Sequence, residues 1–79
     1  MDKNSFTIQQ EAQIFCENIK NLREAHHLSE KEMAKILGIG VERLQSIEKG
    51  ILPPKLTVRI LFHIQKHFHI KPQDMFRKI

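Results

Sequence analysis

The chain has 79 residues, of which 41% are hydrophobic and 28% are charged, and its formal net charge is +4 at pH 7. This length allows one small domain without a large substrate cleft, and the composition argues against disorder and low-complexity sequence. Its single cysteine, Cys16, cannot close a disulfide within the chain, and no apolar run approaches the ~18 residues that cross a bilayer. We therefore expect a soluble, cytoplasmic, single domain over residues 1–79.

The spacing of apolar residues predicts helices and no strand. A first, long helix is expected to begin at Thr7 or Ile8, because Thr7 and Gln10 have capping-box spacing, and to end near His26. His27 then occupies a helix-stop position, where a left-handed backbone is often needed and histidine tolerates it. The apolar stripe of this helix comprises Ile8, Ala12, Phe15, Ile19 and Leu22.

Two short helices joined by a tight turn are predicted next. Ser29 and Glu32 form a capping box that opens the first of them, and Gly38 ends it. The second runs over residues 41–49 until Gly50 terminates it. Their inward faces would carry Met33, Ala34, Leu37, Leu44 and Ile47.

The last third of the chain contains two further predicted helices. The double proline argues against regular helix over residues 51–56. Thr57 is a suitable N-cap for a fourth helix that ends near Phe68, and Pro72 fits the first turn of a short fifth helix. The predicted fold is therefore all-α, a compact bundle of five helices.

The short pair of helices has the geometry of a helix-turn-helix. Ala34 is small where two helices cross at close range, Gly38 can take the left-handed conformation at the corner, and Leu44 and Ile47 anchor the second helix to the core. The opposite face of the second helix is left free. In a helix-turn-helix that face lies in the DNA major groove, while the first helix of the pair crosses the phosphate backbone.

Four segments carry a resemblance to a known family: I-x-x-L-R-E at 19–24, L-S-E-K-E-M-A-K-I-L-G-I at 28–39, L-Q-S-I-E-K-G at 44–50, and H-F-H-I-K-P-Q-D-M-F at 67–76. Over about residues 19–76 the chain resembles the lambda-repressor and Cro-like helix-turn-helix proteins, also called the xenobiotic-response-element family. The resemblance implies a transcriptional regulator, repressor-like, that binds double-stranded DNA as a homodimer. It also implies a buried ion pair between Arg23 on the first helix and Glu48 on the recognition helix.

The resemblance places base reading on Val41, Glu42, Arg43 and Ser46. Arg43 could read guanine or bind phosphate, Val41 could contact a thymine methyl, and Ser46 could serve base or backbone. Glu42 would be repelled by phosphates unless it accepts a hydrogen bond, for example from cytosine N4.

Backbone contacts are expected from Ser29 and the amides at the start of the second helix, and from Lys35, Lys49, Lys55 and Arg59. Residues 1–50 carry seven basic and eight acidic side chains, whereas residues 51–79 carry six basic and one acidic. The basic surface therefore belongs to the last third. It fits a polyanionic partner, and it equally fits cations that only solvate the surface.

Three departures from the family pattern leave a second function open. Gly40 stands where a serine or threonine cap is common, Glu42 is anionic on the reading face, and Glu30 replaces a glutamine that often contacts phosphate. The alternative to DNA binding is a protein-interaction module that retains the helix-turn-helix scaffold and no longer reads DNA.

Catalytic and metal chemistry find little support in the sequence. His63 and His67 are four residues apart with His69 nearby, but no convergence of three or four ligands is indicated, so no metal site is expected. The sequence has no phosphate loop or nucleophile elbow, and Cys16 has no catalytic signature. We expect no enzyme, no cofactor and no small-molecule substrate.

The fourth predicted helix is apolar on more than one face. One stripe should fill the core, and the surplus could form a self-association patch, because an exposed apolar cluster usually marks an interface. The alternative is that the long first helix covers it. The candidate patch comprises Ile60, Phe62, Met75, Phe76 and Ile79.

Overall fold

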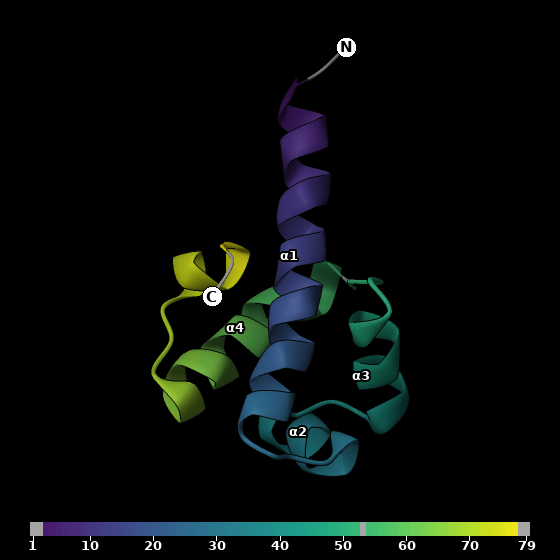
Figure 1. Cartoon of the computed structure of the whole chain (residues 1–79), viewed down its shortest axis with the longest axis vertical. Coiled ribbons are helices and arrows are strands. Elements are labelled where there is room, and N and C mark those ends of the chain that lie inside the picture. Colours follow the sequence, from purple (N-terminus) through teal and green to yellow (C-terminus); the bar gives the residue numbers. More distant parts are fainter. Residues whose placement is uncertain (1–2, 53, 78–79) are drawn as a thin grey trace.

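The computed structural model describes residues 3–52 and 54–77, which contain four α-helices, one 3-10 helix and no strand (Figure 1). The all-α prediction is confirmed, but the predicted fifth α-helix is a five-residue 3-10 helix. Its backbone bonds span three residues, as in Asp74 N–H to Lys71 C=O, which is the spacing often found in short helical segments. The elements are α1 (Lys3–Ala25), α2 (Glu30–Leu37), α3 (Val41–Glu48), α4 (Pro54–Phe68) and η1 (Pro72–Phe76).

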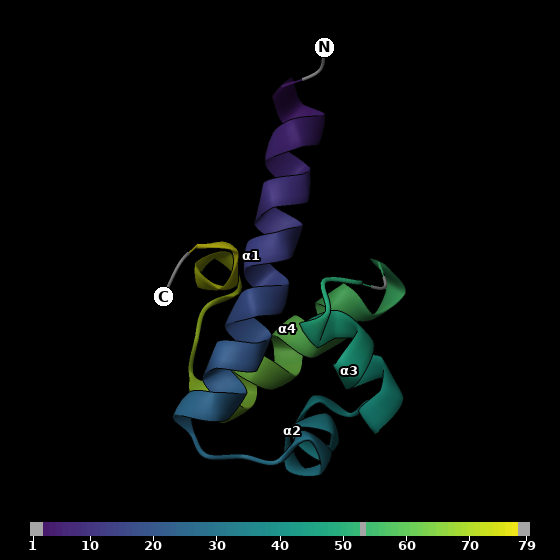
Figure 2. The same ribbon diagram turned by 45° about the vertical axis from the view of Figure 1, so that its right-hand side comes forward.

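Helix α1 begins at Lys3, so the expected N-cap at Thr7 is wrong and that residue lies inside the helix. No glycine or proline interrupts residues 3–25, and a capping signal does not stop a helix that can continue past it. Figures 1 and 2 show the first turns of α1 projecting beyond the other helices. The predicted stripe is buried at Phe15, Ile19 and Leu22, Ala12 is half-buried, and the side chain of Ile8 lies outside the described residues.

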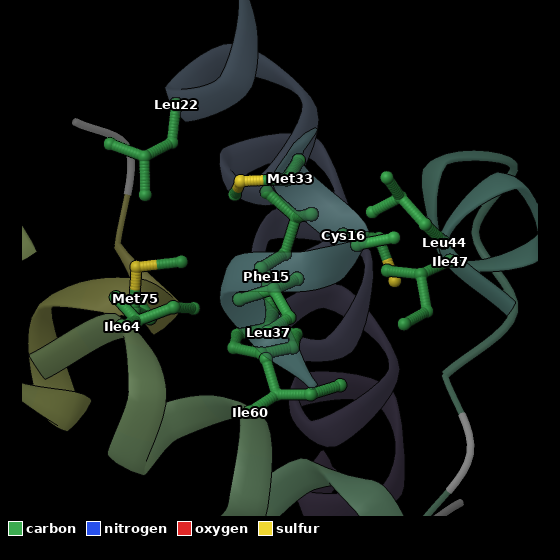
Figure 3. Close-up of a cluster of buried hydrophobic side chains, with 12 residues drawn as sticks. Phe15, Cys16, Leu22, Met33, Leu37, Leu44, Ile47, Ile60, Ile64 and Met75 are labelled. Carbon is green, nitrogen blue, oxygen red and sulfur yellow. The ribbon is translucent and has the colours of Figure 1, made fainter. Parts of the chain in front are cut away.

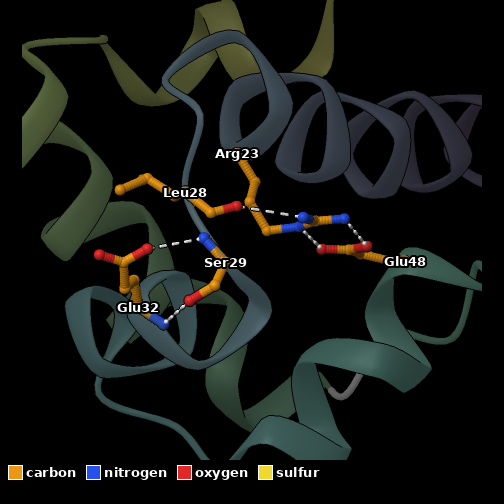
Figure 4. A network of polar contacts seen from close by, with 5 residues as sticks. All are labelled: Arg23, Leu28, Ser29, Glu32 and Glu48. Carbon is orange, nitrogen blue, oxygen red and sulfur yellow. Dashed lines mark hydrogen bonds and ion pairs between the residues drawn. The ribbon is translucent and has the colours of Figure 1, made fainter.

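The connection from α1 to α2 follows the local signals in the sequence. His27 has the predicted left-handed backbone (φ 55°), and the Leu28 N–H bonds back to the Arg23 carbonyl at 3.0 Å. The capping box of α2 is complete: the Glu32 N–H donates to Ser29 Oγ at 3.0 Å, and the Ser29 N–H donates to Glu32 Oε1 at 2.8 Å (Figure 4). The bond from the Ser29 N–H to the Glu32 carboxylate, with a further contribution from the Ser29 side chain, lowers the pKa of Glu32, because it favours the ionised form.

Helix α4 begins at Pro54, three residues before the expected cap, so Thr57 lies inside the helix and residues 54–56 are helical. A proline is compatible with the first helical turn, where a backbone N–H would have no partner within the helix. The helix ends at Phe68 as predicted. His69 follows with a left-handed backbone (φ 60°), a feature that the sequence reading missed.

One hydrophobic core joins all the elements (Figure 3). Helix α1 packs on α3 and η1, while α2 packs on α3 and α4. The buried hydrophobic residues are Phe15, Cys16, Ile19, Leu22, Met33, Ala34, Leu37, Leu44, Ile47, Ile60, Ile64 and Met75.

The C-terminal η1 is fastened to α1 by one polar side chain and one ring contact. Asn18 is 2% exposed, and its Nδ2 donates to the carbonyls of Met75 at 2.8 Å and Arg77 at 2.6 Å. The rings of Phe15 and Phe76 stack with centroids 5.2 Å apart. The sequence reading did not identify Asn18, because a polar residue beside an apolar stripe carries no signal of the carbonyls it will meet.

The five residues predicted as a self-association patch do not form one exposed cluster, so that prediction is wrong. Ile60 and Met75 are fully buried in the core. Phe76 is half-buried against α1, as expected if the long first helix covers the apolar surplus. Only Phe62 of the described members stands out, with 60% of its surface exposed. Ile79 lies outside the described residues.

Candidate nucleic-acid interface

The turn between α2 and α3 is held tightly by its backbone and by α4. Gly38 has φ 71°, and its N–H points back to the carbonyls of Ala34 and Lys35. A Cβ at this position would lie 3.2 Å from His63 Nε2 and 3.8 Å from Arg59 Nε. Both the left-handed backbone and the close approach of α4 therefore favour glycine at the corner.

Helix α3 is buried on one side only. Leu44 and Ile47 are fully buried against the core, as predicted. Glu42 and Arg43 are exposed, whereas Val41 and Ser46 are half-buried. The structure thus presents two of the four predicted base-reading side chains openly, and Val41 packs partly against the core.

Gln45 is an exposed residue of α3 that the sequence reading did not select. It lies three residues after Glu42 and four before Lys49, so these side chains share a helix face. The helical spacing alone could have identified it. We call Glu42, Gln45 and Ser46, together with Lys49 directly after the helix, the outer face of α3.

An ion pair fixes the end of α3 to α1 (Figure 4). Arg23 Nε lies 2.8 Å from Glu48 Oε2, and Nη2 lies 3.0 Å from Oε1, so the pair is bidentate. Arg23 Nη1 also donates to the Leu28 carbonyl at 3.2 Å. The side chains are 16% and 9% exposed, so the pair is partly buried rather than fully buried.

The three hydrogen bonds of Arg23 connect α1, the α1–α2 turn and the last turn of α3. The bond to Glu48 raises the pKa of Arg23 above its usual range, against the opposing effect of burial. A bidentate guanidinium–carboxylate contact restricts orientation as well as distance. The pair therefore sets the tilt at which α3 presents its outer face.

The expected phosphate ligands are all exposed on the surface: Ser29, Lys35, Lys49, Lys55 and Arg59. Arg59 reaches from α4 toward the α2–α3 turn, where its Nε would lie near any side chain at position 38. The start of α2 offers less to a phosphate than expected. Its capping box already uses the amides of Ser29 and Glu32, and the Met33 N–H bonds to the Ser29 carbonyl.

A shallow hollow of about 350 Å³ borders the outer face of α3. It contains charges of both signs from three helices, so it has no strong preference for either sign of ligand. Glu30 lies in the same hollow as Lys49, which places a carboxylate near an expected phosphate ligand. The lining residues are Lys20, Glu30, Gln45, Glu48 and Lys49.

The histidines of α4 and Cys16 lie in different surroundings. His63 is half-buried next to Gly38, whereas His67 is exposed and its ring meets that of its chain neighbour Phe68 edge-on, with centroids 5.1 Å apart. Burial raises the pKa of the Cys16 thiol, and the charge of Glu17 adds to the effect. In the described ranges 3–52 and 54–77, no group of three or more histidine, cysteine or acidic residues is placed to hold a metal ion, and no helix could cross a membrane.

The chain is similar in sequence to known helix-turn-helix proteins. The model of the helix-turn-helix family matches residues 19–74. A protein of Methanocaldococcus jannaschii, named as an uncharacterized HTH-type transcriptional regulator, is 36% identical over 58 residues, which cover 73% of this chain and 85% of that protein. No solved structure matches at a comparable level.

Proposed function

Because the chain belongs to the helix-turn-helix family of lambda-repressor and Cro-like proteins, we propose that it is a sequence-specific, repressor-like regulator that binds double-stranded DNA. One observation carries this proposal. Helix α3 is anchored by Leu44 and Ile47 in the core and by Glu48 on Arg23, while Glu42, Arg43 and Gln45 remain exposed. An α-helix with such a free side fits the width of the major groove.

Base reading would fall to Glu42, Arg43, Gln45 and Ser46, with a smaller part for Val41. Arginine suits guanine O6 and N7, and glutamine suits adenine N6 and N7, because each side chain can form two hydrogen bonds. Glu42 would accept from cytosine N4. Half-buried Val41 and Ser46 support short contacts close to the helix, such as a thymine methyl or a phosphate oxygen.

Phosphate binding would come from residues around α3. Ser29 and Lys35 belong to the start and body of α2, Lys49 follows α3 directly, and Lys55 and Arg59 lie on α4, with Arg59 beside the α2–α3 turn. The Ser29 hydroxyl accepts the Glu32 N–H and can donate its own proton either to the Glu32 carboxylate or to a phosphate oxygen. These cations would fix the position of the helix on the duplex without reading its sequence.

We further propose that the protein acts as a homodimer on DNA. Two α3 helices related by a two-fold axis would address half-sites about 34 Å apart, one helical turn of the duplex. A palindromic binding site with that spacing is the expected signature.

The decisive experiment is unbiased selection of duplex DNA by the full chain, followed by variants that separate reading from positioning. Arg43→Ala should relax preference at one base position, with a loss of about 1–3 kcal/mol for the preferred base. Lys55→Ala should weaken all sequences alike and reduce the salt slope by about one. Lys66→Ala is the matched control, because it removes an exposed α4 lysine that the proposal does not use.

A second candidate function is a protein-interaction module on the same scaffold. It is favoured by Glu30 and Glu42 at the α2–α3 surface, and by Gly40, which gives α3 no side-chain cap. Failure to enrich any duplex from a random pool at low salt, by protein that is folded, would replace the DNA proposal with this one.

A further inference from the structure

The solvent-facing side of α4 combines apolar and cationic side chains without any acid. Lys55, Val58, Arg59, Phe62 and Lys66 follow the spacing of one helix face, and all five are exposed. Val58 is 77% exposed and Phe62 is 60% exposed. We call these five residues the outer face of α4.

These apolar side chains are not needed for the core. Ile60 and Ile64 of the same helix are fully buried on its opposite side and already anchor α4 (Figure 3). Val58 and Phe62 are one helical turn apart, the spacing at which two side chains form a continuous ridge. Lys66 Nζ lies 6.0 Å from the Phe62 ring centroid, so its stem and charge border the ring. Burial of such a ridge is favourable only when an apolar surface of a partner removes it from water.

The charge around the ridge selects the partner. Residues 51–73 contain no aspartate or glutamate, so the three cations of the outer face have no acidic neighbour along α4. A second copy of the same face would bring Lys55, Arg59 and Lys66 against the same cations, which is unfavourable in a partly desolvated contact. DNA would match the charge and would leave Val58 and Phe62 without apolar cover.

A membrane surface fits less well than a protein segment. A helix that lies in a bilayer interface inserts a broad apolar face, whereas the broad apolar face of α4 is the one that contains Ile60 and Ile64 in the core. Two apolar side chains one turn apart match instead the groove between side chains of a second helix.

We propose that the outer face of α4 is a docking site for an acidic amphipathic segment of another protein. Apolar side chains of that segment would pack on Val58 and Phe62, and its carboxylates would pair with the flanking lysines and arginine of the face. This inference does not rest on DNA binding by α3. Lys55 and Arg59 belong to both proposals, so the test uses Phe62 and Lys66, which belong to the α4 site alone.

The probe is a phage-displayed library of random 14-residue peptides, selected on the immobilised full chain. Enriched peptides should carry a net negative charge and a pair of apolar residues three or four positions apart. In fluorescence anisotropy, Phe62→Ser should weaken the best peptide about ten-fold or more, from the apolar area that it no longer buries. Lys66→Ala should weaken it a few-fold, and less at high salt.

Two matched controls accompany these variants. Ile51→Ser removes an apolar side chain of similar exposure, 62%, outside the face, and Lys35→Ala removes an exposed cation from α2. Both should leave the peptide affinity within two-fold. Phe62→Ser should also leave the affinity for selected DNA unchanged, so that failure of one proposal is distinguishable from failure of the other.

Several results would overturn the docking proposal. The first is enrichment of no peptide, of basic peptides, or of peptides that bind Phe62→Ser as well as the unaltered chain. The second is a dimer in sedimentation equilibrium that Phe62→Ser dissociates, because a second copy would then occupy the face. The third is binding to phosphatidylglycerol vesicles that requires Phe62, which would assign the face to a lipid surface.

Discussion

Removal of the ion pair between Arg23 and Glu48 tests how strongly this contact stabilises the packing of α3 against α1. Glu48→Ala would remove both acceptors of a bidentate contact whose distances are 2.8 and 3.0 Å, and leave a guanidinium that is only 16% exposed. Breaking a buried pair typically costs about 3–5 kcal/mol, and we expect the lower end, about 3 kcal/mol, because water reaches part of this pair.

The expected loss is large for a chain of this size. At roughly 0.05–0.15 kcal/mol per residue, the free energy of unfolding of this domain is about 4–12 kcal/mol. In a domain of 60–100 residues, about 3 kcal/mol lowers the melting temperature by about 12–24 °C. Circular dichroism of the unaltered chain and of Glu48→Ala in one buffer measures this shift directly.

Two further variants make the test specific. The double variant Arg23→Ala/Glu48→Ala should lose less than the sum of the two single variants, because the unpaired charge is then gone. Arg77→Ala, which removes an exposed partner at 3.9 Å from Asp74, should change stability by no more than about 0.5 kcal/mol. Unaltered melting temperatures in both single variants at the pair would refute the role given to it.

Three other predictions follow from local geometry. Gly38→Ala should destabilise by about 1–2 kcal/mol in chemical denaturation, because of the positive φ and the α4 side chain 3.2 Å from the new Cβ. Gly40→Ala should cost less, because Gly40 has no atom within 4 Å of the new Cβ and a backbone that alanine adopts freely, so only its N-cap position disfavours alanine. Asn18→Ala should leave two C-terminal carbonyls without their donor, cost about 2–3 kcal/mol, and speed amide exchange in η1 more than in α2. The pKa of Glu32 is lower in the folded chain than in the unfolded chain. Its contribution to the free energy of unfolding is therefore fully present above the unfolded pKa and is lost as pH falls through the folded pKa. Glu32→Ala and the unaltered chain should therefore differ in melting temperature at pH 7 and converge toward pH 3, and an equal gap at both values would exclude the bond to Ser29 as its source.

The features that could be predicted from the sequence are mostly those that depend on interactions between residues close together in the chain. The capping box at Ser29, the left-handed backbone at His27 and Gly38, and the helical spacing of the apolar residues Leu44 and Ile47 all depend on neighbours within one or two helical turns. Such interactions are the same in any fold that contains the segment, so spacing and residue type were sufficient to place α2 and α3. The helix-turn-helix assignment followed from these local signals together with the family motifs.

Tertiary contacts decided which apolar and polar side chains are used by the core. Ile60 and Phe62 lie two residues apart on an apolar helix, and only the packing of α4 buries the first and exposes the second. Asn18 found its acceptors 57 and 59 positions away, a distance along the chain that no helical period encodes. Long-range packing depends on how whole helices are oriented, and that orientation also left the outer faces of α3 and α4 free to meet partners.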